Sequence, residues 1–340
     1  MKTLSFCILI IILTIGGAFS EDESMSKEGH LWKTRPKNVY SIEHLIDFLE
    51  LGARVHLCRP VRHEAAKTSS PDMERGIVYL DVIDTVRGAA RDNLVLPYSF
   101  SPKNTTYKSG PAIWPDLSNL GSSNLLCVVV PNSRDLTAYL DTDQTFVEAA
   151  SRVIPVKDKS DVSVLTIKRL CEIYDLKDAT QMAKELRMAI GDKQQAVVDF
   201  ALQAVAMKLS KAIPDEAIQI VQSRASQYTR KTESIEEAQR FISFIESKSG
   251  HVEPWKPMNY FFARCMIVLA QSQSFEVRKA ATKGLAHLIT KSNRIEGFSL
   301  KSGLSAQEIE IIRKTVGDFK RDLPNSDFSE LQLVDTWLEP

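Results

Sequence analysis

The chain has 340 residues, and its 43 Lys and Arg balance its 43 Asp and Glu, so the formal net charge is zero. Proteins that bind nucleic acid gather Lys and Arg on one surface and release counterions from the phosphates. Here the basic residues stand in pairs and triplets along the chain, which argues against a nucleic-acid partner. A typical domain holds roughly 150 residues, and 44% hydrophobic content is ordinary for a globular protein, so we expect two domains.

Residues 1–20 have the pattern of a signal peptide. Lys2 precedes an apolar run from Leu4 to Ile15, and Ala18-Phe19-Ser20 places small residues where a signal peptidase reads. The run is too short for a comfortable membrane span, and no later run approaches ~18 apolar residues. We therefore expect a secreted or periplasmic protein without a membrane span after signal removal. Residues 21–38 are polar and aperiodic, which predicts a flexible tail.

Residues 39–155 predict a β-rich domain with one leading helix. Apolar residues recur at helical spacing from Ser41 until Gly52, where the helix is expected to end. Beyond Gly52 the pattern changes to short β-branched or alternating segments separated by turn-forming residues. The expected strands are Arg54–Cys58, Gly76–Ile83, Leu94–Leu96 and Asn124–Val130. Short strands at these separations are typical of a small barrel or sandwich.

Residues 160–340 predict an all-α domain, preceded by a polar linker at 156–161. From Asp175 onward the apolar residues keep helical spacing. Two segments have the pattern of a capping box, in which a serine and a glutamate satisfy each other's backbone amides at a helix start. They are Ser234–Glu237 and Ser305–Glu308. The whole chain therefore predicts an α+β fold: a small N-terminal β barrel or sandwich, then an all-α helical array, either solenoid-like or a bundle.

Two segments resemble known families. Phe275 to Leu288 resembles the second helix of a HEAT-type repeat, with Val277-Arg278, then small residues that let neighbouring helices approach, then Gly284-Leu285. Val55 to Pro131 resembles the small OB-like β domains of exported proteins, through Val86-Arg87-Gly88 and the late apolar strand. The first resemblance implies a stacked helical array, and the second a small β barrel.

Catalytic and metal-binding patterns are absent from the sequence. There is no Gly-x-Ser-x-Gly elbow, no phosphate-binding glycine loop and no CxxC-type ligand pair. Several His and acidic residues fall near one another, but without the spacing of a metal site; these are His56, His63, Glu64, Asp81 and Asp84. We accordingly predict no catalytic residue, metal ligand or cofactor.

The cysteines and tryptophans supply the remaining candidates. Cys58 and Cys127 lie in expected strands and form a candidate disulfide in an oxidising compartment, with two buried thiols as the alternative. Trp255 and Trp114 stand in proline-bracketed loops, so either ring presents itself to a partner or fills the edge of its own core. Lys256, beside Trp255, is placed to engage an acidic or carbonyl group.

These observations favour an exported, non-catalytic binding or scaffold protein that contacts a protein or a cell-envelope component through its helical array. A hydrolase-type enzyme with an interdomain cleft is one alternative. A β module that inhibits a protease is another. The sequence leaves open the oligomeric state, the identity of the partner and glycosylation at Asn104.

Overall fold

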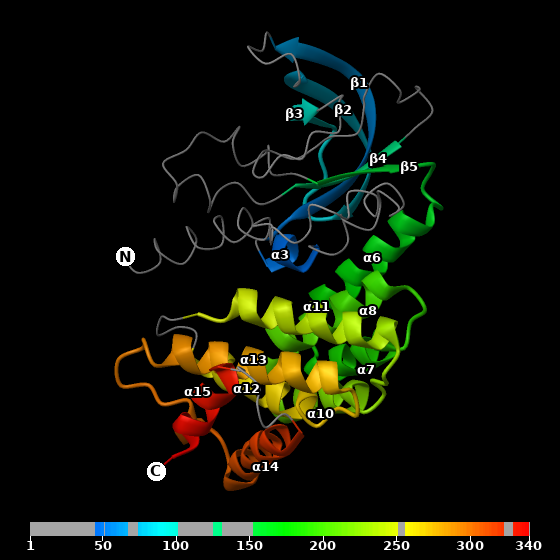
Figure 1. Ribbon diagram of the computed structural model, residues 1–340. Coiled ribbons are helices and arrows are strands. Elements are labelled where there is room, and N and C mark those ends of the chain that lie inside the picture. Colours follow the sequence, from blue (N-terminus) through cyan, green and yellow to red (C-terminus); the bar gives the residue numbers. More distant parts are fainter. Residues whose placement is uncertain are drawn as a thin grey trace. The chain divides into compact units, whose positions relative to one another are not determined.

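The structure, a computed structural model, describes residues 45–50, 52–66, 74–100, 125–130, 152–250, 256–322 and 329–339 (Figure 1). The chain divides into two compact units, Met1–Asp175 and Leu176–Pro340. The first contains an antiparallel sheet and the second is helical, so the α+β class is confirmed. None of the described helices has the length and apolar character needed to cross a membrane.

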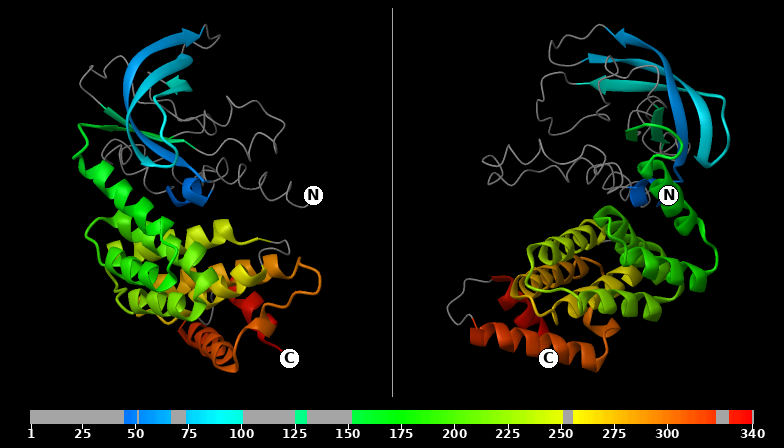
Figure 2. Two further views of the ribbon diagram at one scale, coloured as in Figure 1. Left: turned by 180° about the vertical axis from the view of Figure 1, so that it is seen from behind. Right: turned by 90° about the vertical axis from the view of Figure 1, so that its right-hand side faces the viewer.

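Five strands form the sheet of the first unit, in the order β3-β2-β1-β4-β5 with every neighbouring pair antiparallel. The strands are β1 (Arg54–Ala66), β2 (Glu74–Arg87), β3 (Asn93–Phe100), β4 (Leu125–Val130) and β5 (Arg152–Val156). β1 and β2 are long and bend along their length (Figures 1 and 2). Three register shifts between these two strands accompany the bend, as expected of β-bulges. Strand β5 was not predicted from the sequence.

Side chains alternate between the two faces of the sheet, and both faces are buried around β1 and β4. One face carries the apolar cluster Cys58, Val78, Leu80, Leu94, Leu126, Val128 and Val130. The opposite face carries Val55, Leu57, Cys127, Val129, Ile154 and Val156, none more than 4% exposed. The two edge strands each contain a proline, Pro97 and Pro155. Because proline cannot donate to a ladder, both edges are protected against pairing with further strands.

The described part of the first unit also contains the helices α3 and α6. In α3 (Leu45–Glu50) the apolar residues Leu45, Ile46, Phe48 and Leu49 are buried, and Gly52, with φ of 69°, ends the helix as predicted. Positions 41–44 of the predicted helix lie outside the described residues. The second helix, α6 (Val162–Asp175), contacts β2.

The division between the units follows Asp175, whereas we expected the helical domain to begin at residue 160. The reason is that α6 is fastened to the sheet. Arg87 of β2 binds Asp175 at 2.8 Å, and the Tyr174 hydroxyl donates to Glu50 of α3 at 2.6 Å. The polar segment 156–161 therefore connects two parts of one unit.

The described part of the second unit consists of helices. Their bounds are α7 (Ala179–Ile190), α8 (Gln195–Ala204), the π-helical turn η4 (Val205–Leu209), α9 (Ser210–Ala212), α10 (Pro214–Ala225), α11 (Thr232–Lys248), α12 (Lys256–Leu269), α13 (Phe275–Ser292), the 3-10 turn η6 (Lys301–Gly303), α14 (Ala306–Asp322) and α15 (Ser329–Leu338). α13 contacts α11, α12 and α15.

Gly284 lies where α13 passes closest to its neighbours. A Cβ atom there would stand 2.7 Å from the Met266 side chain of α12 and 3.3 Å from Ile242 of α11. The small residue therefore permits a close helix approach, which is the role that the HEAT-type resemblance assigns to small residues in this segment.

One of the two predicted capping boxes is confirmed. At the start of α14 the Ser305 amide donates to the Glu308 carboxylate at 2.7 Å, and the Glu308 amide donates to the Ser305 hydroxyl at 3.2 Å. The box predicted at Ser234 is wrong, because α11 begins earlier, at Thr232. Its glutamate, Glu237, is instead only 3% exposed and binds Arg224.

Candidate functional site

An open groove of about 450 Å³ lies between α13 and α15 in the helical unit. Its lining is Ile289, Asn293, Ser329, Gln332, Leu333, Thr336 and Trp337. This volume falls within the range of ligand pockets, about 300–1,000 Å³, and the mixture of apolar residues with a few polar groups is typical of them. We take this groove as the candidate functional site.

Helix α15 has apolar side chains on two of its sides. Leu331, Val334 and Leu338 are buried, as their spacing of three and four residues predicts. Leu333 and Trp337, which are four residues apart, lie on another side of the helix; Leu333 is 38% exposed and Trp337 is half-buried. Both apolar side chains line the groove.

Charged groups hold α15 at both of its ends. At the start, Glu330 pairs with Lys283 of α13 at 3.5 Å. At the end, the Lys301 ammonium donates to the carbonyls of Leu338 and Glu339 at 3.2 and 2.8 Å, which satisfies groups left unpaired at a helix C-terminus. The groove wall is thus fixed in place.

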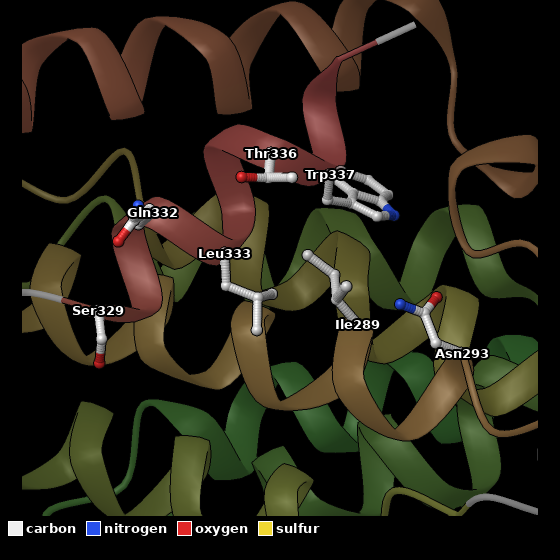
Figure 3. Close-up of a pocket in the computed structure, with 7 residues that line it drawn as sticks. All are labelled: Ile289, Asn293, Ser329, Gln332, Leu333, Thr336 and Trp337. Carbon is white, nitrogen blue, oxygen red and sulfur yellow. The ribbon is translucent and has the colours of Figure 1, made fainter.

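The apolar side chains Leu333 and Ile289 lie in the middle of the groove (Figure 3). Leu333 and Ile289 point into the space between the helices, and Ile289 is buried at the base. Trp337 and Asn293 lie at one end, while Ser329 and Gln332 lie at the other. A ligand in the groove would therefore meet an apolar centre flanked by two carboxamides.

The described lining of the groove is uncharged. None of its seven residues is ionisable, so none of these seven is a candidate general acid or base. The Ser329 hydroxyl donates to Glu330 at 3.2 Å, and that carboxylate is paired with Lys283. Asn293 and Gln332 each offer a donor and an acceptor, which match the N–H and C=O groups of a peptide backbone.

A second cluster of polar groups, buried between α8, α10 and α11, has a structural role. Arg224 holds Glu237 through two bonds of 2.7 Å, and Gln195 bridges Glu237 and Asp199 at 3.1 and 2.9 Å. Arg240 binds the other oxygen of Asp199 at 2.8 Å. Both carboxylates are occupied by partners from neighbouring helices, which leaves neither available to a substrate.

The pKa values of these two carboxyl groups move in opposite directions. Burial raises the pKa of Asp199 against the effect of Arg240 and Gln195. Burial also acts to raise the pKa of Glu237, but its hydrogen bonds with Arg224 and Gln195 outweigh this and lower it. The bidentate arginine accounts for the difference.

His56 of β1 is fully buried. Its Nδ1 lies 3.0 Å from the Thr85 hydroxyl, and its Nε2 has no hydrogen-bond partner among the described residues. Burial, with a smaller effect of Arg54 and Arg91, lowers the pKa of His56 to about 4. The ring is therefore neutral at pH 7 and belongs to the sheet's interior.

None of the candidate residues from the sequence is among the described residues that line the groove. Trp114 and Trp255 are outside the described residues. Lys256 is the first residue of α12, and its side chain is not described. Cys58 and Cys127 are both buried and carry free thiols in the structure. The disulfide between them stays a prediction for an oxidising compartment.

The groove was not predicted from the sequence, although part of its pattern is local. Leu333 and Trp337 depart from the buried face of α15 by about a third of a turn, so a helical projection separates them from Leu331 and Val334. The facing residues Ile289 and Asn293 lie some forty positions earlier in the sequence. That separation corresponds to roughly ten turns of a continuous helix, and no local sequence pattern extends so far.

No family model, curated protein or solved structure matches this chain. Within the described ranges, no group of three or more His, Cys, Asp or Glu side chains gathers as a metal ion would require.

Proposed function

We propose that this is an exported, non-catalytic binding protein, whose helical region holds a segment of a partner protein in the groove between α13 and α15. The observation that carries the proposal is the groove lining, in which Leu333, Ile289 and Trp337 are combined with two carboxamides and no ionisable group. An uncharged peptide segment matches both the apolar and the carboxamide groups of this lining. Its apolar side chains would pack against the centre of the groove, and its backbone would hydrogen-bond with the two side-chain carboxamides.

Export rests on the signal-like pattern of residues 1–20, and the localisation we propose is secreted or periplasmic. Trp255, Lys256 and Trp114 remain proposed as additional contacts to the same protein or cell-envelope partner. We propose no nucleic-acid partner and no membrane span after signal removal. The oligomeric state is left open.

For the finer architecture, we propose that the sheet belongs to a small OB-like barrel and that the helices form a HEAT-like array. The bends and register shifts of β1 and β2 support the first, since bulged, bent strands permit a sheet to curl. The close approach at Gly284 supports the second.

The test uses the chain from Glu21 onward and a displayed library of random short peptides. Peptides selected on this protein are measured by calorimetry against Leu333→Asp, which places a charge in the apolar centre. We expect affinity to fall by at least about tenfold. Met188→Asp is the matched control, because Met188 is a 49% exposed apolar residue on α7 of the same unit.

Selected peptides that bind Leu333→Asp as tightly as the unmodified protein would place the contact elsewhere and overturn the groove assignment. A library that yields no binder would overturn the proposal that the groove binds a peptide. The thermal midpoint of each variant is measured in parallel, since an unfolded variant would also lose binding.

A further inference from the structure

Beneath α15, the helices α12, α13 and α14 form an apolar slot. Val334 of α15, which is 0% exposed, lies in this slot beside a residual cavity of about 10 Å³. The slot walls include Ile267 of α12, Thr282 and Leu285 of α13, and Ile312 and Val316 of α14. The space left over is about that of one water probe, so the slot and the side chain that fills it fit closely.

Helix α15 occupies the slot in the way that a recognition helix occupies a groove. Its buried residues Leu331, Val334 and Leu338 are spaced by three and four, which is the anchor spacing of an amphipathic helix in an apolar groove. α15 contacts both α13 and α14. The structure therefore shows what kind of segment this slot accepts.

The rim of the slot is basic where its occupant is acidic. Lys283 of α13 pairs with Glu330, and Lys320 of α14 pairs with Asp335. The two acids flank the anchors in the sequence, one just before the first and one just after the second. Charge complementarity of this kind selects among helices of similar apolar pattern.

Every contact that fixes α15 is one that another helix of the same pattern could make. The required pattern is an acid, an apolar residue, two free positions, an apolar residue, an acid, two free positions and a final apolar residue. We propose that the slot is a docking site for acidic amphipathic helices, that α15 is its occupant within the chain, and that a partner protein's helix of this pattern displaces α15.

Displacement would also regulate the groove between α13 and α15. Five of the seven described residues that line this groove belong to α15, and they project from it in Figure 3. A partner helix that displaces α15 therefore removes one wall of the groove. This consequence rests on the proposed function, whereas docking in the slot does not.

The first experiment uses the chain from Glu21 onward and a fluorescent synthetic peptide of residues 329–339. In the unmodified chain α15 competes with the peptide from within the same molecule, at a high effective concentration. Val334→Asp in the chain removes this competitor's central anchor and frees the slot. We expect the peptide to bind the Val334→Asp chain at least about tenfold more tightly than the unmodified chain.

Charge exchange tests the basic rim. In the Val334→Asp chain, a second change, Lys320→Glu, should weaken peptide binding by about threefold, because an exposed ion pair becomes a repulsion. A peptide carrying Asp335→Lys should recover that loss. Lys314→Glu is the control of equal charge, since Lys314 is exposed on α14 about a third of a turn away from Lys320. It should leave binding unchanged.

Hydrogen exchange of the unmodified chain tests displacement without relying on any variant of the chain to fold. The peptide, at about 1 mM, should speed amide exchange in α15 while α12 and α13 stay protected. The fluorophore distinguishes its fragments by mass from those of the chain. A peptide carrying Val334→Asp is the control, because it keeps Leu333 and Trp337, which line the groove, but lacks the anchor.

Unchanged exchange in α15 would overturn displacement, and a folded Val334→Asp chain that binds the peptide no more tightly would overturn the slot. Light scattering across a range of chain concentrations tests a second copy as the occupant. A dimer that the free peptide converts to monomers would assign the slot to another copy and overturn the partner. No groove ligand enters these measurements, so their failure and that of the proposed function are distinguishable.

Discussion

Arg87 binds Asp175 through two parallel bonds of 2.8 Å, and it joins the end of β2 to the end of α6. The same guanidinium donates to the Ala53 carbonyl at the start of β1. The hydrogen bond to Asp175 raises the pKa of Arg87. A planar guanidinium makes this arrangement, and a lysine could reproduce only part of it.

Replacing Arg87 by Lys should lower the free energy of unfolding by about 1–2 kcal/mol, since one bond to Asp175 and the bond to Ala53 are lost. Asp175 is 45% exposed, so solvent screening limits the loss. Arg62→Lys is the control: its pair with Glu64 is more than half exposed and should change stability by less than ~0.5 kcal/mol. Urea denaturation measures both, and equal effects would contradict the joining role of Arg87.

Glu237→Gln removes the charge that neutralises Arg224 inside the helical unit. Because Glu237 is 3% exposed and holds Arg224 through two bonds, we expect a loss of roughly 2–4 kcal/mol. Glu310→Gln, whose pair with Arg313 is exposed, should stay within about 0.5 kcal/mol. A Glu237→Gln variant as stable as the unmodified protein would show that the cluster is replaceable by neutral groups.

Two glycines of the helical unit should respond to alanine in opposite directions. A Cβ at Gly303 would lie 1.9 Å from the Tyr260 ring, so Gly303→Ala forces the ring away and should cost about 1–3 kcal/mol. At Gly317, within α14, nothing lies within 4 Å, and Gly317→Ala should stabilise by up to ~1 kcal/mol through helix propensity. Thermal melts of the two variants decide the matter, and shifts of the same sign would contradict this packing.

Acid should destabilise the sheet through His56. The pKa of His56 is lowered to about 4 in the folded protein from an ordinary 6.5, so the unfolded chain binds a proton first as pH falls. This contribution, about 3 kcal/mol, is complete above pH 6.5 and is lost progressively toward pH 4. His56→Gln should flatten the fall in stability across this window. Parallel curves for the variant and the unmodified protein would exclude His56 as the cause.

The mature chain should begin near Glu21. Ala18 and Ser20 meet the small-residue requirement of signal peptidase, and the acidic residues from Glu21 suit the exposed side of the cleavage site. N-terminal sequencing of protein recovered from the exported fraction tests this, and an intact Met1 there would refute it.

Local patterns in the sequence were sufficient for the elements whose stability is local. The helix stop at Gly52, the capping box at Ser305 and the α+β order of the chain followed from spacing and short-range hydrogen bonding. Strand β4 was recognisable because a run of buried apolar residues is continuous in the sequence.

Tertiary structure decided the features that depend on distant partners. Ser234 and Glu237 have the spacing of a capping box, but Glu237 binds Arg224 of α10 instead. Helix α11 therefore begins at Thr232 rather than after Ser234. α6 belongs with the sheet because Arg87 binds its last residue, which no local pattern records. Strand register set Cys58 and Cys127 on opposite faces, since a shift of one residue reverses every side chain. The groove likewise exists only where α15 returns to α13, because its two walls are remote in the chain and meet through long-range packing.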